Sequence, residues 1–370
     1  MAKLVVCLDG TDQTRAQADP TNIARLFDAL GGAVTDAGND SWETTTADPV
    51  PTLGKYLPGV GSLGNPILRI LGDAFGDGIA EPIVRGYTFL SRSYAPGDEI
   101  VITGFSRGAA AARALAGFVC GQGLLDPTKY DATDKNAAYL RAIAAWYAYR
   151  KERPDLADQS RVDFISLTLG QTVPTLGAGD FIAPPPVRAV AVFDTVSSLG
   201  LPQVDANGDA VFDFSICNTA LSPNVQSGFH ALSADETRDL FAPTLWDARD
   251  GVLQQIFPGS HSNVGGGFPE RGLSDAALEW MLGRLESAGL AFDRAKVAPP
   301  IVANALDTAR DDAVTLLFIV TPRRPRTFPA CASPSATLLA RCGQMTVTLP
   351  GAAYKPYEPT GKYADGTPLS

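Results

Sequence analysis

Short apolar runs alternate along most of the chain with segments in which apolar residues recur every three or four positions. A continuous apolar run predicts a strand buried on both faces, and the wider spacing predicts a helix with one face on the core. The predicted strands cover residues 4–8, 100–103, 187–193 and 252–257, and the predicted helices cover residues 22–30, 78–94, 109–119, 136–150 and 273–285. Strands alternating with helices predict an α/β fold with a mostly parallel sheet and helices on both of its faces.

Three stretches depart from this alternation. Residues 45–64 mix proline and glycine with little periodicity, so we expect an ordered surface loop there. Residues 201–246 lack long apolar runs. They predict an irregular insertion at about residues 201–250, which could cap a site. A helix is expected within it, near residues 234–241. The tail from about Pro322 is rich in proline and short polar residues and is expected to wrap the rest. The whole chain, 1–370, is thus predicted to be one domain with insertions.

The charge balance argues against a nucleic-acid partner. The formal net charge is −10 and the sequence pI is about 4.8, so a phosphate backbone would be repelled. An anionic membrane would not attract the chain over long range, and any membrane contact is expected to be transient and apolar. No apolar run approaches the roughly 18 residues of a spanning helix. The N-terminal run is too short for a signal peptide, so a cytoplasmic location is expected.

The five cysteines show neither metal-ligand spacing nor a C-x-x-C pair. An odd number without a signal peptide favours reduced thiols, and we predict neither a bound metal nor a cofactor. Two interpretations remain open for Cys331 and Cys342. They would form a disulfide in an oxidising compartment, and they would otherwise be small buried apolar residues.

The strongest chemical signal is the pentapeptide Gly-Phe-Ser-Arg-Gly at residues 104–108, which lies between a predicted strand and an alanine-rich predicted helix. This is the strand, sharp turn and helix of a nucleophile elbow. The central serine of such a turn adopts a strained backbone, and small residues two positions before and after it let the helix pack closely on the strand. Gly104 and Gly108 occupy those positions, so we predict that Ser106 is a nucleophile.

A serine hydroxyl needs a base, and the chain has only two histidines. His261 lies in a glycine-rich loop directly after a predicted strand, where the carboxyl ends of parallel strands gather ligand sites. His230 precedes a segment with helical character, which favours a buried or capping imidazole. We therefore predict that His261 is the general base.

The acid that orients this base is predicted to be Asp194. Asp194 and Asp213 both follow a Val-Phe pair, but Asp213 lies in a short polar insertion beside a hairpin signal. Asp194 instead ends a buried predicted strand. The order Ser106, Asp194, His261 is the chain order of α/β-hydrolases.

The oxyanion of an acyl-transfer intermediate needs two N–H donors. One is predicted to be the backbone N–H of Arg107, the residue after the nucleophile, and the other an N–H of the turn at Gly10 and Thr11. We assign Arg107 a backbone role only, because arginines along a helix usually meet solvent or a carboxylate. Asp9 is expected to cap this turn and to order it.

Motifs spread over nearly the whole chain resemble the catalytic domain of type VI secretion phospholipase effectors, a family of serine α/β-hydrolases. They lie at residues 8–11, 56–61, 104–109, 193–196 and 258–267, with accessory motifs at 230–232, 245–246, 273–275, 280–281 and 354–356. The resemblance implies a catalytic triad of Ser106, Asp194 and His261 and the cleavage of phospholipid acyl esters. It also implies export by a type VI secretion system, with a secretion-machinery or immunity partner.

One departure from the family pattern concerns the first motif. The family usually has tryptophan and asparagine there, whereas Asp12 and Gln13 follow Thr11 in this chain. The pocket near the oxyanion turn is therefore expected to differ from that of relatives.

Other functions remain open. A stand-alone carboxylesterase or thioesterase acting on a small non-lipid ester would use the same triad, and a catalytically inactive hydrolase fold could serve as a binding module. Residues 8–11 are also similar to the start of haloacid-dehalogenase-type phosphotransferases. That mechanism is excluded because Cys7 stands where the nucleophilic aspartate is needed.

Overall fold

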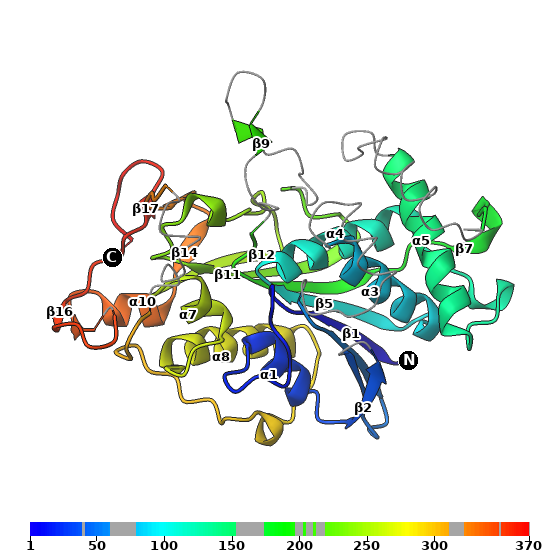
Figure 1. Cartoon of the computed structure of the whole chain (residues 1–370), viewed down its shortest axis with the longest axis horizontal. Coiled ribbons are helices and arrows are strands. Elements are labelled where there is room, and N and C mark those ends of the chain that lie inside the picture. The colour runs from blue at the N-terminus through cyan, green and yellow to red at the C-terminus, as the bar shows by residue number, and fades with distance from the viewer. Residues whose placement is uncertain are drawn as a thin grey trace.

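The computed structural model describes residues 1–38, 41–59, 79–152, 174–196, 203–204, 210–211, 219–310, 322–347 and 349–369. In this part of the chain the largest sheet has nine strands in the order β14-β12-β11-β8-β5-β1-β4-β3-β2 (Figure 1). Seven of them run parallel: β1 (Lys3–Leu8), β4 (Thr52–Leu57), β5 (Glu99–Phe105), β8 (Val187–Phe193), β11 (Val225–Ser233), β12 (Val252–Phe257) and β14 (Ala332–Pro334). The strands β2 (Ala33–Gly38) and β3 (Ser41–Thr45) add an antiparallel edge.

Helices cover both faces of this sheet (Figure 1). One face carries α3 (Ala80–Ser93), α4 (Arg107–Gln122) and α5 (Lys135–Glu152), and the other carries α1 (Asn22–Ala29) and α8 (Gly272–Ser287). The smaller elements are α7 (His261–Gly265), α10 (Ala336–Arg341) and the strand pairs β6 (Leu124–Leu125) with β7 (Phe181–Ile182), β9 (Gln203–Val204) with β10 (Ala210–Val211), β13 (Thr327–Phe328) with β17 (Lys362–Tyr363), and β15 (Met345–Thr346) with β16 (Lys355–Pro356). The expected α/β fold is therefore confirmed.

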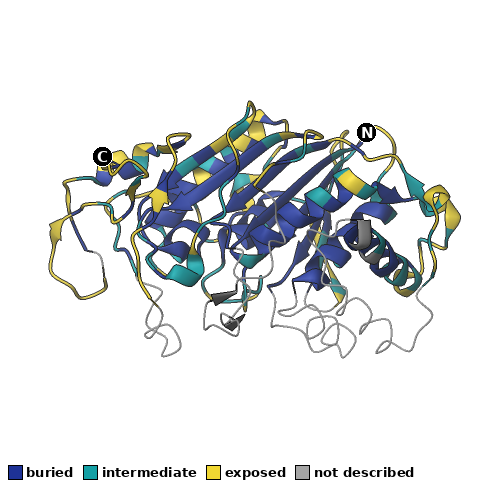
Figure 2. Cartoon of the chain, turned by 90° about the horizontal axis from the view of Figure 1, so that it is seen from above, coloured by how far each residue is buried: buried dark blue, intermediate teal, exposed yellow. Residues whose placement is uncertain are grey.

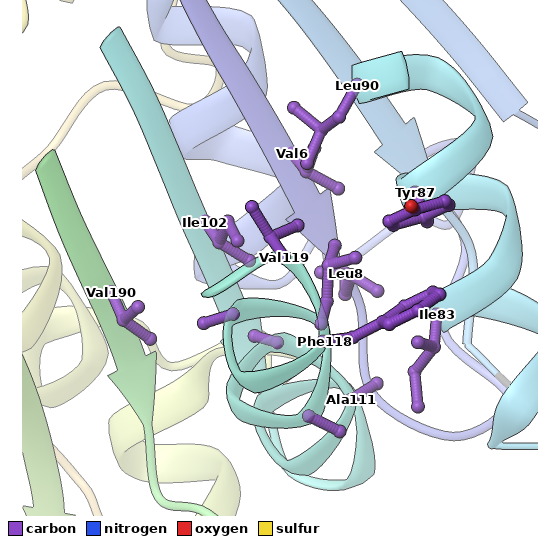
Figure 3. Close-up of a cluster of buried hydrophobic side chains, with 14 of the residues drawn as sticks. Val6, Leu8, Ile83, Tyr87, Leu90, Ile102, Ala111, Phe118, Val119 and Val190 are labelled. Atoms are coloured by element: carbon purple, nitrogen blue, oxygen red, sulfur yellow. The ribbon is translucent and has the colours of Figure 1, made fainter. Parts of the chain in front are cut away.

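The central strands are buried on both faces, which is why they read as apolar runs (Figure 2). On the face of α3 and α4, Leu8 from β1 lies in one cluster with Tyr87 and Phe118 (Figure 3). The rings of Tyr87 and Phe118 stack with their centroids 4.0 Å apart. This contact holds α3 against α4, the helix that directly follows the predicted nucleophile Ser106.

The four strands and five helices predicted from the alternating pattern are confirmed. The four strands correspond to β1, β5, β8 and β12, and the five helices correspond to α1, α3, α4, α5 and α8. Their ends differ from the predicted ends by a few residues. The alanine-rich helix, for example, begins at Arg107 rather than at Ala109.

The loop expected at residues 45–64 is wrong for residues 52–57, which form β4 next to β1. Two residues of this strand, Gly54 and Lys55, interrupt the apolar run that would predict a buried strand. A Cβ on Gly54 would lie 2.6 Å from Leu30 Cδ1, so this glycine marks close packing of the strand rather than a turn. Lys55 is buried, and its ammonium lies 3.0 Å from a carboxylate oxygen of Glu43 on the neighbouring β3. The hairpin of β2 and β3 also had no counterpart in the predicted elements.

The irregular insertion expected at residues 201–246 is wrong for residues 225–233, which form β11 in the interior of the sheet. Polar residues and a glycine interrupt its apolar run, so its sequence lacks the pattern of a buried strand. The helix expected near residues 234–241 is also wrong, because this segment contains only a 3-10 turn at Asp239–Phe241. Asp213 lies outside the described residues.

The described tail packs on the end of the sheet formed by β11 and β12. Its apolar residues form a third cluster with Leu232 and Ile256: Phe328, Ala332, Leu338, Tyr357 and Leu369. Cys331 and Cys342 both carry free thiols, and Cys331 is exposed. Within the described ranges, no helix has both the length and the apolar character needed to cross a membrane.

Candidate active site

Ser106 lies in a sharp turn between β5 and α4 and has a strained backbone. Its φ of 58° and ψ of −124° are unfavourable for a residue with a side chain. Its N–H donates to the carbonyl of Phe193 at 3.1 Å, and its own carbonyl accepts from Ala109 at 3.1 Å. These bonds hold Ser106 between the ends of β5 and β8.

The two glycines of the pentapeptide let the turn close. A Cβ on Gly104 would lie 2.3 Å from the carbonyl oxygen of Gly108. A Cβ on Gly108 would lie 2.3 Å from the carbonyl oxygens of Leu8 and Asp9 at the end of β1. Since real Cβ atoms do not approach backbone so closely, helix α4 can begin against β1 and β5 only with glycine at both positions.

Asp194 and His261 form a buried pair at the same edge of the sheet. Asp194 directly follows β8, and His261 begins α7 a few residues after β12. Oδ2 of Asp194 lies 2.6 Å from Nδ1 of His261. The ring of Phe105, the residue before Ser106, packs on the His261 ring with the centroids 4.6 Å apart. The structure thus places the three predicted residues at the carboxyl edge of the sheet, with His261 against the nucleophile turn.

Asp194 is held as a carboxylate. It is fully buried, which by itself raises the pKa of Asp194, but the guanidinium of Arg326 and the hydrogen bond from His261 outweigh burial and hold that pKa well below its usual range. An ionised carboxylate can only accept hydrogen bonds, so Nδ1 of His261 donates to it. The other ring nitrogen, Nε2, is then left with a lone pair that can take a proton.

Nε2 of His261 is buried and has no hydrogen-bond partner among the described residues. An unpartnered buried nitrogen is unusual, because such groups are nearly always paired. The arrangement suits a general base whose partner is the proton of a reacting group.

Arg326 is a site residue that the sequence analysis missed. Its Nη1 and Nη2 donate to Oδ1 and Oδ2 of Asp194 at 2.6 and 2.9 Å. It comes from the proline-rich tail and lies close in sequence to Arg323 and Arg324. No sequence pattern distinguishes the three arginines, because only the folded tail brings one of them to Asp194.

In the turn after β1, one of the predicted oxyanion donors, the N–H of Gly10, already has an acceptor. Gly10 lies beside the nucleophile, since a Cβ on Gly10 would be 3.4 Å from Ser106 Cβ. Its N–H, however, donates to Oδ1 of Asp9 at 2.7 Å, so this expected oxyanion donor is already engaged. The reason is that the Asp9 side chain folds back onto its own turn.

Arg107 was predicted to contribute only its backbone, but its side chain also makes a hydrogen bond. Its Nε donates to Oγ1 of Thr11 and so joins the first turn of α4 to the turn after β1. The backbone N–H of Arg107 belongs to the first turn of α4, where a regular helix provides no internal acceptor. Arg107 and Thr11 thus lie on the two segments from which oxyanion donors were expected.

Asp9 is a fully buried anchor of this turn. Its carboxylate accepts hydrogen bonds from Oγ1 of Thr21 at 2.9 and 2.7 Å and from the hydroxyl of Tyr56 at 2.6 Å. Burial raises the pKa of Asp9 to about 6, although these hydrogen bonds act in the opposite direction. The expectation that Asp9 orders the turn agrees with these contacts.

The second histidine has the buried position expected for it. His230 lies in β11, and its Nε2 accepts from the N–H of Thr195 at 3.1 Å. Burial, aided by the charge of Arg113, lowers the pKa of His230 to about 3. The ring is therefore neutral at ordinary pH.

Among the described residues, no group of three or more His, Cys, Asp or Glu side chains could hold a metal ion. The polar groups that do converge are a strained serine, an imidazole and a buried carboxylate. Together they can activate a hydroxyl group for attack on an acyl carbon.

Several known proteins and one protein family are similar to this chain. Residues 2–284 match the family described as "T6SS, Phospholipase effector Tle1-like, catalytic domain". A Saccharomyces cerevisiae protein described as uncharacterized is 27% identical over 251 residues, which are 64% of this chain and 32% of that protein. The chain thus spans about a third of that relative's length.

Two solved structures are also similar. The crystal structure of an uncharacterized protein from Pseudomonas aeruginosa has a TM-score of 0.40 and 18% identity, and the match covers 79% of this chain and 46% of that one. The structure of the Tle1 effector bound to the VgrG spike from the type VI secretion system has a TM-score of 0.38 and 19% identity, covering 73% of this chain and 52% of that one. The family match extends over most of the chain, so we conclude that this protein belongs to the Tle1-like catalytic-domain family of type VI secretion phospholipase effectors.

Proposed function

We propose that this protein is a serine hydrolase that cleaves carboxylic esters, and phospholipid acyl esters in particular. The observation that carries the proposal is the 2.6 Å contact between Asp194 and His261 beside the strained turn of Ser106. A strained backbone persists only where the surrounding structure holds it, and such residues cluster at functional sites. The family name supports a lipid substrate.

In the proposed mechanism, Nε2 of His261 takes the proton of Ser106 Oγ as Oγ forms a bond to the acyl carbon. The backbone N–H groups of Arg107 and Thr11 stabilise the oxyanion of the tetrahedral intermediate. The carbon–oxygen bond of the ester then breaks, and His261 returns the proton to the leaving alcohol.

The second half of the reaction repeats these steps with water. His261 takes a proton from a water molecule, whose oxygen attacks the acyl carbon of the acyl-enzyme. The bond to Ser106 Oγ breaks, Oγ regains a proton from His261, and the carboxylic acid leaves. Asp194 remains a carboxylate throughout and stabilises the imidazolium that forms in each half.

The family also suggests how the protein would reach its substrate. One similar solved structure is described as an effector bound to a VgrG spike. We propose that this chain is exported by a type VI secretion system and that a spike protein is its secretion partner. Contact with the target lipid would then be transient.

The proposal is tested by hydrolysis of two kinds of substrate, short p-nitrophenyl esters and fluorogenic diacyl phospholipids. Wild type is compared with Ser106→Ala and with the control Ser287→Ala, which alters a serine on the exposed end of α8. We expect phospholipid turnover in wild type and Ser287→Ala, and a loss of at least about a thousandfold in Ser106→Ala.

Two outcomes would revise the proposal. Turnover of short esters alone, lost in Ser106→Ala, would favour a stand-alone esterase over a phospholipase. An absence of Ser106-dependent turnover on either kind of substrate would contradict the enzyme and favour a binding module.

A further inference from the structure

Arg326 makes a two-pronged contact with the carboxylate of the candidate triad. Both of its terminal nitrogens donate to Asp194, one to each oxygen, at 2.6 and 2.9 Å. Its side chain is 4% exposed and that of Asp194 is 0% exposed, so water does not screen the pair. A planar guanidinium that faces a carboxylate in this way fixes the orientation of the carboxylate as well as its charge.

The guanidinium is itself held on two other sides. Nη1 also donates to the carbonyl of Ser233 at the end of β11, at 2.9 Å, and Nη2 to the carbonyl of Phe241, at 2.5 Å. The carbonyl of Arg326 accepts from the N–H of Lys362 at 3.1 Å, so the surrounding tail fixes its backbone. Arg326 therefore has one well-defined position.

We propose that Arg326 is a positioning residue of the active site, which holds the Asp194 carboxylate in the plane that directs Oδ2 at Nδ1 of His261. The inference rests on the proposed function for its catalytic consequence. It assigns the tail a part in the chemistry, since the residue that orients the triad comes from outside the segment that matches the family.

The hydrogen bonds of Asp194 show what would be lost without Arg326. Oδ2 accepts from His261 and from Arg326, and Oδ1 accepts from the Ser233 N–H at 2.9 Å and from Arg326. Without the guanidinium each oxygen would keep one donor. The plane of the carboxylate would then no longer be fixed, although its negative charge would stay beside His261, and this buried charge would lose its counter-ion.

Arg326 also changes the electrostatic environment of His261. The positive guanidinium offsets part of the negative charge of Asp194, so it limits how far Asp194 stabilises a protonated imidazole. The other charged groups nearby form a second pair. Glu236 Oε2 accepts from the backbone N–H of His261 at 3.4 Å and from Arg238 Nη2 at 2.7 Å. His230, on β11, is neutral.

The charge effect can be measured without any substrate. Because the chain has only two histidines and His230 titrates far into the acid range, NMR of histidine-labelled protein resolves the titration of His261. In Arg326→Met the titration midpoint of His261 should move up by about one pH unit, since a nearby positive charge is lost. The acid limb of the pH profile of kcat/KM should shift to higher pH by the same amount.

A matched control lies two residues away. The side chain of Arg324 is 79% exposed and pairs with Asp239 at 3.3 Å. Arg324→Met removes the same charge from the same segment, and we expect it to leave the midpoint and the acid limb within about 0.2 pH unit of wild type, since water screens this charge.

Arg326→Lys separates orientation from charge. Lysine keeps the positive charge but cannot donate to both carboxylate oxygens in one plane. We therefore expect a midpoint within about 0.3 pH unit of wild type, together with a kcat about tenfold lower and an unchanged KM. Guanidinium ions added to Arg326→Gly should restore part of the lost kcat.

The inference is overturned if Arg326→Met leaves the His261 midpoint unmoved, or if Arg326→Lys has the kcat of wild type. If Arg326→Met does not fold, the kcat of Arg326→Lys decides alone. A moved midpoint in a protein without Ser106-dependent turnover would retain the coupling of Arg326 to His261 and reject the ester-hydrolase function. The two failures are therefore distinguishable.

Discussion

The hydroxyl of Tyr56 donates a 2.6 Å hydrogen bond to the carboxylate of Asp9 and so joins the carboxyl ends of β4 and β1. Both side chains are buried, and the same carboxylate accepts from Gly10 in the turn beside Ser106. Burial nevertheless raises the pKa of Asp9 to about 6. The turn that is expected to bind the oxyanion thus depends on a carboxyl group that titrates just below neutral pH.

This raised pKa predicts a pH-dependent stability. The folded state binds the Asp9 proton more tightly than the unfolded state, in which the pKa is about 4. The stabilising effect is fully present below about pH 4 and is lost as the pH rises through about 6. The free energy of unfolding should fall by about 3 kcal/mol over that range relative to Asp9→Asn. Urea unfolding of both proteins from pH 4 to 7.5 measures the difference, and parallel curves would contradict the prediction.

Asp194→Asn should inactivate the enzyme without moving the nucleophile. Arg326 would retain the amide oxygen, so the amide N–H₂ would face His261 and force its proton onto Nε2. Nε2 could then no longer accept the proton of Ser106. We expect kcat to fall by about ten thousandfold, measured on the ester that wild type hydrolyses best.

The control for this substitution is Asp239→Asn, which alters a partly exposed carboxylate paired with Arg324. It should keep the activity of wild type. Circular dichroism of Asp194→Asn establishes that the protein is folded. A folded Asp194→Asn with more than about a tenth of wild-type kcat would reject Asp194 as the orienting acid.

Gly108→Ala should destabilise the fold, because the added Cβ would lie 2.3 Å from two backbone oxygens of β1. Helix α4 would have to move away from the sheet, at a cost of about 3 kcal/mol or more. The matched control is Gly283→Ala in α8, where a Cβ would meet no atom within 4 Å. That change should instead stabilise the protein by about 0.5 to 1 kcal/mol. Thermal unfolding distinguishes the two, and equal melting temperatures would refute the argument.

The sequence was most informative where one physical requirement shows as one residue pattern. Strand β8 is buried on both faces and therefore reads as a continuous apolar run. The turn at Ser106 needs two close backbone approaches, and these appear as glycines at fixed spacing. The predicted positions of Ser106, Asp194 and His261 followed from such patterns.

The sequence did not predict hydrogen bonds and ion pairs between residues that the fold brings together. Lys55 is tolerated in β4 because Glu43 on β3 neutralises it. His230 is tolerated in β11 because its ring accepts from the backbone of Thr195. Arg326 meets Asp194 across 132 residues of sequence, and the Asp9 side chain occupies the Gly10 N–H. None of these pairings has a local signature.

Strand β14 forms one edge of the large sheet, where a second copy of the protein could add a strand. The sheet ends there in three residues, and the last, Pro334, has no N–H to offer an incoming strand. At the opposite edge, β2 is mostly exposed, and its pairing with β3 shifts register between Asp36 and Gly38. Short or irregular edges of this kind discourage sheet-to-sheet aggregation. The tail that brings Arg326 to the site thus also ends the sheet in a strand that is a poor pairing partner for a second copy.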